Sequence, residues 1–151
     1  RPARDLTFRL GYSLVDAKIK DGAGLVGTPL EFEVGKQLSL IPRHTITGAA
    51  TWTPPLADTL NALVHADFRF QSEQVTSSQS RGIADNEGFA VVNARIGVAS
   101  ADNKWRLEVF VENLFDKYYH IGTFAVPEQP GTIAAYPTPP RFYGVSARVG
   151  F

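Results

Sequence analysis

The chain contains no cysteine and no methionine among its 151 residues. Without cysteine it can form neither disulfide bonds nor thiolate metal sites. Lysine plus arginine and aspartate plus glutamate are balanced at 15 each, so no net field attracts nucleic acid or an anionic surface. There is no signal peptide and no run of about 18 apolar residues, which excludes a transmembrane helix. Because no methionine stands at position 1, we expect a cut or processed chain.

What the chain does contain is alternation of apolar and polar residues with the period of a β-strand. Six such segments are predicted at about residues 5–15, 45–53, 59–71, 89–99, 104–113 and 141–151. No comparable stretch has the 3.6-residue spacing of an amphipathic helix. The sequence therefore predicts an all-β fold.

The last predicted strand ends on an aromatic residue with no polar tail. Its apolar face comprises Tyr143, Val145, Ala147, Val149 and Phe151. Transmembrane β-barrels have strands that are apolar outward, polar inward and bordered by interfacial aromatics. The terminal strand is typical of that pattern.

In all six segments the apolar face carries no Asp, Glu, Lys, Arg or His. A charge on the lipid face of a barrel costs roughly 2–4 kcal/mol at the bilayer midplane. Evolutionary selection against that cost would leave strand faces without charged residues. The core face of a soluble sandwich would exclude charge as well, so the pattern permits both interpretations.

The connections between the predicted strands alternate strictly in length. Residues 16–44, 72–88 and 114–140 form long connections, and residues 54–58 and 100–103 form short ones. Outer-membrane barrels have short periplasmic turns and long extracellular loops, whereas long structureless loops are uncommon in compact domains. The alternation favours an antiparallel transmembrane barrel segment of about six strands.

Large aromatics fall at predicted strand ends. Trp52, Trp105 and Phe151 would lie outward at the periplasmic rim, where amphipathic rings prefer to sit. The alternative is that these aromatics belong to the core of a soluble domain.

The fifth strand runs into a recognisable motif. It comprises Glu112, Asn113, Leu114, Phe115, Asp116 and Tyr119. A long loop follows, and then Pro-Pro-Arg-x-Tyr-Gly-Val over residues 139–145, before the terminal aromatic. Over its whole length, residues 1–151, the chain resembles the C-terminal barrel portion of TonB-dependent outer-membrane receptors.

The resemblance implies a 22-stranded barrel with a plug domain inside its lumen, in the outer membrane of a Gram-negative bacterium. This chain would supply only the last six strands, without the plug. The parent would import a scarce nutrient, most commonly a ferric siderophore or another iron complex, by TonB-energised transport. The implied partners are outer-membrane lipid, the plug and remaining strands, the TonB complex through the parent's N-terminus, the barrel-assembly machinery and a small metal chelate. No nucleic-acid partner is expected.

Charged and polar residues gather on the opposite, predicted lumen face. This lumen wall comprises Arg9, His65, Asp67, Arg69, Arg95, Arg106, Glu108, Glu112 and Arg148. The resemblance implies that such a wall contacts the plug and borders the substrate path. A ladder of cross-strand ion pairs is the interpretation we favour for most of these residues, because mixed charges can satisfy one another.

His65 and Asp67 are the residues closest to a catalytic pattern. Side chains two residues apart on a strand lie about 7 Å from each other, too far for a direct hydrogen bond. No other residue stands out as a nucleophile, so we expect no enzyme activity. The three histidines lack ligand spacing, and neither a metal nor another cofactor is expected.

For three segments the sequence permits two roles each. The Asn113–Asp116 element is predicted to be structural rather than ligand-binding. Residues 122–140 are an equally good candidate for ligand contact or for a solvated loop. The apolar residues of the terminal strand would serve as an assembly signal, face lipid, or do both.

Two other classes of protein remain open. A passive porin or a translocator barrel would use the same strands without a plug. A soluble β-sandwich binding module would instead bring Leu10, Val64, Val109 and Val145 together in a dry interior between two layers.

Overall fold

The computed structural model describes residues 5–28 and 30–150. Its strands are β1 (Leu6–Leu14), β2 (His44–Trp52), β3 (Pro55–Ala57), β4 (Leu60–Gln71), β5 (Phe89–Ser100), β6 (Trp105–Glu112), β7 (His120–Ala125), β8 (Ile133–Pro137) and β9 (Phe142–Val149). Two short 3-10 helices are η1 (Glu31–Glu33) and η2 (Ser78–Ser80). No helix in the described part of the chain is long and apolar enough to cross a membrane.

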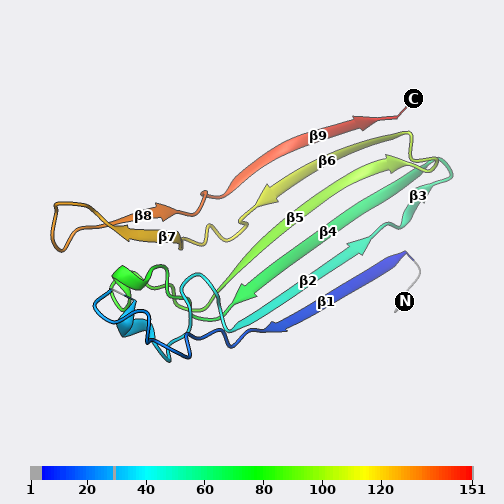
Figure 1. Cartoon of the computed structure of the whole chain (residues 1–151). Coiled ribbons are helices and arrows are strands. Elements are labelled where there is room, and N and C mark those ends of the chain that lie inside the picture. Colours follow the sequence, from blue (N-terminus) through cyan, green and yellow to red (C-terminus); the bar gives the residue numbers. More distant parts are fainter. Residues whose placement is uncertain (1–4, 29, 151) are drawn as a thin grey trace.

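Most strands form one antiparallel sheet in the order β1-β2-β4-β5-β6-β9, with β3 pairing to β4. Figure 1 shows this sheet as a single curved layer. The all-β prediction is confirmed, and the six predicted strands correspond to β1, β2, β4, β5, β6 and β9 to within two residues. Among the described residues β1 and β9 are the edges of the sheet, which does not close into a barrel.

The register keeps apolar residues opposite apolar residues across the sheet. Phe8 pairs with Ala50 and Ala50 with Ala66, while Val109 pairs with Val145. A slip of one residue would move every side chain to the other face. The alternation in the sequence therefore specifies both the pairing and the two faces of the sheet.

Two glycines allow close packing within the sheet. The Phe68 ring lies where a Cβ at Gly48 would stand, so the ring covers that glycine on the apolar face. A Cβ at Gly97 would overlap the carbonyl oxygen of Leu107 on the neighbouring strand. β5 and β6 can therefore approach closely at this point only without a side chain.

The connections contain more structure than the sequence predicts. Residues 114–140, predicted to be a loop, carry the hairpin of β7 and β8, which is a separate two-stranded sheet. Residues 54–58 contain β3, and the other two long connections contain η1 and η2. These segments escaped prediction because they are short and because Pro and Gly interrupt their alternation.

The three long connections meet at one end of the sheet, and the short ones lie at the other (Figure 1). We call residues 15–43, 72–88 and 114–141 the loop head, and the opposite end of the sheet the turn end. The hairpin of β7 and β8 extends beyond the sheet, as Figure 1 shows.

Candidate functional site

The apolar face of the sheet is uncovered. Leu10 is 81% exposed, Val145 is 69% exposed and Val109 is 53% exposed. The hydrophobic residues that are buried in the described chain, Leu63, Phe89 and Ala99, lie on the opposite face. In the part of the chain that the structure describes, no second layer covers the apolar face, so these residues do not form the dry interior that a sandwich requires.

A histidine, His44, lies on this face at the end of the sheet next to the loop head. His44 stands opposite Leu14 in the register, on the apolar side. Its Nδ1 atom lies 2.9 Å from the hydroxyl oxygen of Tyr12, and the two rings stack. The alternation in the sequence predicts a strand that begins at Thr45, one position later, and so does not place His44 on this face.

At the turn end the apolar face carries two exposed tryptophans. Trp52 pairs with Leu6, and Trp105 pairs with Val149. Both indoles are partly exposed to solvent, at 48% and 41%. Phe151, the third member of the predicted aromatic rim, lies outside the described residues.

The candidate assembly strand is β9, at the edge of the sheet. Tyr143, Val145, Ala147 and Val149 share the apolar face and are exposed. Only the β6 side of β9 is paired among the described residues. The terminal Phe151 of this set again lies outside them.

A chain of polar contacts crosses the opposite face. Thr51 Oγ1 and His65 Nδ1 lie 2.7 Å apart, and His65 Nε2 lies 3.4 Å from Asp67 Oδ1. The expectation of a separation of about 7 Å between His65 and Asp67 is therefore wrong, because the two side chains lean toward each other. Asn93 donates to Asp67 at 2.8 Å and accepts from the backbone of Asn113. We interpret this chain of contacts as a brace between strands.

The expected ladder of cross-strand ion pairs is also wrong. On this face the ion pairs of the described chain run along single strands, between His65 and Asp67 and between Arg106 and Glu108. Across strands, Arg106 stands directly opposite Arg148. The polar side chains alternate with apolar ones along each strand, as predicted. The apolar side chains set the register between strands, and this register does not place opposite charges across from each other.

Glu108 is buried beside Gly97. It is 8% exposed, and Arg106 Nη1 lies 3.6 Å from its Oε1 atom. That atom accepts no hydrogen bond from the described residues, so the contact with Arg106 is ionic rather than a well-formed hydrogen bond.

The motif that follows β6 holds the base of the loop head. The side chain of Asn113 accepts from the Lys117 backbone at 2.8 Å and donates to the backbone carbonyl of Pro139 at 3.3 Å. Asp116 accepts from the backbone of Arg141 at 2.8 Å. Asn113 and Asp116 both have positive φ, which Asn and Asp tolerate better than most residues. These contacts give the motif a structural role.

The other members of the motif do not take part in these contacts. Leu114 donates its backbone N–H to Val92, and the Tyr119 ring stacks on Phe89 at 4.2 Å. Glu112 and Phe115 are exposed.

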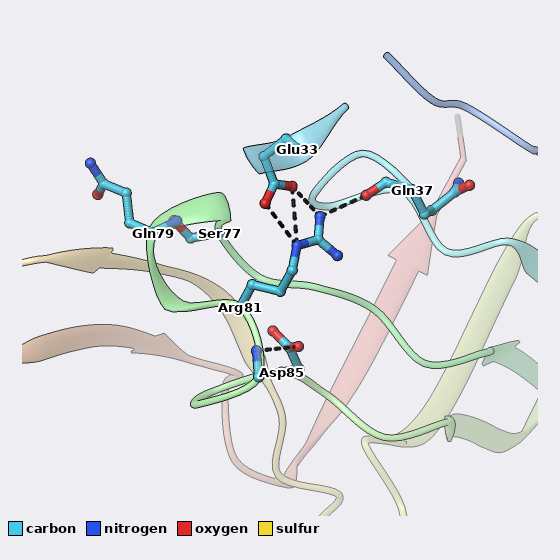
Figure 2. Close-up of polar contacts among 7 residues, drawn as sticks. Glu33, Gln37, Ser77, Gln79, Arg81 and Asp85 are labelled. Atoms are coloured by element: carbon cyan, nitrogen blue, oxygen red, sulfur yellow. Dashed lines mark hydrogen bonds and ion pairs between the residues drawn. The ribbon is translucent and has the colours of Figure 1, made fainter. Parts of the chain in front are cut away.

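An ion pair joins two of the long connections within the loop head. Arg81 donates to Glu33 through Nε at 2.9 Å and again through Nη2, which also donates to the Gln37 carbonyl at 2.9 Å. Figure 2 shows the guanidinium between these two acceptors. Hydrogen bonds from Arg81 lower the pKa of the Glu33 carboxyl, although burial opposes them, and the same bonds raise the pKa of Arg81.

A buried hydroxyl cluster joins the hairpin to residues 72–88. Thr123 Oγ1 lies 2.7 Å from Thr76 Oγ1 and 2.5 Å from Ser80 Oγ, and all three residues are buried. Asn86 and the His120 backbone exchange two hydrogen bonds, of 2.7 and 2.8 Å. Together with the Arg81 ion pair, these contacts connect all three long connections into one head.

A cavity of about 810 Å³ lies where the loop head meets the sheet. Its lining mixes both charges and includes Lys18, Arg43, His44, Glu73, Asp85 and Glu87. Residues 122–140, the loop predicted as a ligand-contact candidate, do not contribute to it.

Within the described residues, no group of three or more His, Asp or Glu side chains is placed to hold a metal ion. Comparison of the chain with protein-family models, curated proteins and solved structures finds no match.

Proposed function

We propose that the chain forms part of the barrel wall of a TonB-dependent outer-membrane receptor. The whole protein, meaning the receptor that contains this chain, would import a ferric siderophore or another iron complex. One observation carries the membrane part of this proposal. A broad sheet face bears exposed Leu, Val, Phe and Trp side chains and carries no Asp, Glu, Lys or Arg within the strands. Monomeric soluble proteins rarely expose an apolar patch of such extent.

In this proposal lipid covers the apolar face and the polar face lines the lumen. The tryptophans at the turn end would sit at the periplasmic interface, and the loop head would lie outside the cell. The open edges at β1 and β9 require further strands, because an unpaired edge is not tolerated in hydrocarbon. The remaining strands of a 22-stranded barrel would pair there and enclose the plug.

The role of the iron-complex importer rests on the resemblance of the motif at residues 112–119 and of the terminal strand. TonB would act through the plug of the parent protein, and β9 would present its apolar residues to the barrel-assembly machinery by strand addition.

A pair of neighbouring substitutions tests the membrane part. In the whole protein, Val145→Arg should reduce assembly into the outer membrane, because a lipid-facing charge costs roughly 2–4 kcal/mol. Ser146→Arg is the matched control, since this residue faces the other side of the same strand. Equal assembly of the two variants, measured by membrane fractionation and protease protection, would argue against lipid on the apolar face.

An uptake assay tests the transport part. Cells that express the whole protein should accumulate a radiolabelled ferric siderophore, and deletion of TonB should abolish this accumulation. Uptake that persists without TonB would instead indicate a passive porin. If none of a panel of iron complexes, cobalamin, haem and glycans enters by a TonB-dependent route, the import proposal fails.

A further inference from the structure

The cavity at the junction of the loop head and the sheet borders the apolar face. Two of its lining residues, His44 and Phe70, belong to that face in the register. A Cβ at Gly88, which also lines the cavity, would stand 3.6 Å from the Phe70 ring. Gln71 and Phe89, the adjacent strand residues of the polar face, do not contribute to the lining. The cavity therefore lies on the outward side of the sheet rather than on its polar side.

In the proposed membrane orientation this cavity lies at the level of the lipid headgroups. Between Trp52 at the turn end and His44 beside the cavity, β2 advances about 26 Å, at roughly 3.3 Å per residue. At a strand tilt of about 40° this is about 20 Å along the membrane normal, close to the apolar band of about 25 Å in outer-membrane barrels. The contact between the Tyr12 hydroxyl and His44 places polar groups at the same edge. A lipid of the outer leaflet would present its headgroup here.

Two positively charged residues of the lining already have partners in the loop head. Lys18 Nζ lies 3.1 Å from Asp16 Oδ1, and Arg81 donates to Glu33. The second of these ion pairs joins two of the connections that surround the cavity. We therefore assign both pairs to the structure of the loop head rather than to a ligand.

The other charged residues of the lining suit a headgroup that carries both signs of charge. Arg43, Glu73 and Glu87 are exposed and take part in none of the ion pairs among the described residues. Asp85 adds a carboxylate, which accepts a hydrogen bond of 2.8 Å from the backbone of Gly82. A guanidinium matches phosphate through paired N–H donors, and carboxylates accept charge-assisted hydrogen bonds from an ammonium group. The excess of carboxylates disfavours a headgroup that carries phosphate alone.

We propose that this cavity binds a membrane lipid whose headgroup combines a phosphate with a primary ammonium group. Arg43 would contact the phosphate, and Glu73 and Glu87 would contact the ammonium. The acyl chains would lie on the neighbouring part of the apolar face, against the exposed side chains of Tyr12 and Leu14. The inference rests on the membrane part of the proposed function and goes beyond it, because this lipid is held by the barrel wall and is not transported.

A lipid fits this position better than a soluble molecule with the same two charged groups. The cavity borders exposed apolar side chains, which acyl chains can cover and a soluble molecule cannot. A lipid in the surrounding bilayer is also confined next to the cavity, so its effective concentration is high. A soluble molecule would have to bind from dilute solution through polar contacts alone.

Native mass spectrometry of the whole protein in detergent, with lipid added, tests the inference. Phosphatidylethanolamine should bind more tightly than phosphatidylglycerol, which has the phosphate but no ammonium group. Glycerophosphoethanolamine, which has the same headgroup without acyl chains, should bind more weakly than the lipid. Equal binding of the two lipids, or tighter binding of phosphatidylglycerol, would overturn the proposed headgroup. Binding of glycerophosphoethanolamine as tight as that of the lipid would overturn the assignment of a lipid.

Single substitutions assign the contacts within the cavity. Glu73→Gln and Glu87→Gln should each weaken binding of phosphatidylethanolamine by about twofold to fivefold without weakening that of phosphatidylglycerol. Arg43→Gln should weaken binding of both lipids, because both carry phosphate. Glu112→Gln is the matched control, since it removes an exposed carboxylate from the polar face and should change neither affinity. The ratio of the two affinities is the decisive measurement, because damage to the fold would lower both.

Failure of this inference can be distinguished from failure of the proposed function. Equal assembly of Val145→Arg and Ser146→Arg would reject the membrane part of the proposal, and the lipid site with it. If those two variants differ but Glu73→Gln and Glu87→Gln keep the wild-type ratio of lipid affinities, the membrane assignment stands and the lipid site is rejected.

Discussion

At the scale of single residues, Arg81 holds two long connections together. Its guanidinium donates to the carboxylate of Glu33, which is only 6% exposed, and to the carbonyl of Gln37. Removing one partner of a buried pair leaves the other charge without compensation. The ion pair therefore matters more to the loop head than an exposed pair would.

We predict that Arg81→Ala loosens the loop head without unfolding the sheet. The local opening free energy of residues 31–37 and 77–85 should fall by about 3 kcal/mol. Hydrogen exchange read by mass spectrometry measures this, with β4 and β5 as internal reference. The double variant Arg81→Met with Glu33→Leu should recover part of the loss, and equal exchange in wild type and Arg81→Ala would contradict the prediction.

The same pair predicts a pH dependence. Because Arg81 lowers the pKa of Glu33 below its ordinary value of 4.5, the pair stabilises the folded head fully above that value. This stabilisation is lost as the pH falls through the lowered pKa. Hydrogen exchange in residues 31–37, corrected for its intrinsic pH dependence, should therefore accelerate in acid. In Glu33→Gln this acceleration should be absent.

Such residue-scale contacts lie beyond what the sequence could predict. Glu33 and Arg81 are 48 positions apart, and nothing in their local patterns pairs them. His65 and Asp67 could be assigned to one face, but their contact depends on side-chain torsions that spacing does not fix. Alternation predicts which face a residue occupies, whereas partners depend on the packed fold.

At the scale of elements, the six long strands of the large sheet were predictable from the sequence, whereas the short strand β3 and the hairpin of β7 and β8 were not. β4 and β5 alternate over 12 residues each, which gives many independent matches to the period of a strand. β8 has only five residues, and it pairs with β7 across a turn that contains Pro130 and Gly131. Buried hydroxyls of Thr76, Ser80 and Thr123 dock that hairpin, a contact made at long range.

Gly97 provides a prediction about how two elements pair. Gly97→Ala should push β6 away from β5, because the new Cβ would overlap the Leu107 carbonyl oxygen. The free energy of unfolding should fall by about 1–3 kcal/mol. The urea unfolding midpoint of the whole protein in lipid vesicles measures this loss. Gly24→Ala is the control, since its Cβ would meet no atom within 4 Å, and equal midpoints for both variants would be evidence against the close approach.

At the scale of the whole molecule, the apolar face of the sheet is the more exposed face and the polar face contains the buried hydrophobic residues. The few hydrophobic residues that are buried among the described residues lie on the polar face, while many large apolar side chains are exposed on the apolar face. Hydrophobic burial within the described chain therefore cannot be the main source of its stability. The apolar face and the edge strands β1 and β9 both need a covering that these residues do not provide.

From the exposed apolar face and the open edge strands we predict how residues 1–151 behave when they are expressed alone. In buffer without detergent these residues should aggregate, because the apolar face and the open edges drive association. Detergent micelles should keep them dispersed, as light scattering after size-exclusion chromatography would show. A triple variant with Thr at Leu10, Val109 and Val145 should aggregate less, since these exposed side chains contribute strongly to the apolar face. A monodisperse monomer that melts cooperatively in plain buffer would contradict the assignment of lipid to this face.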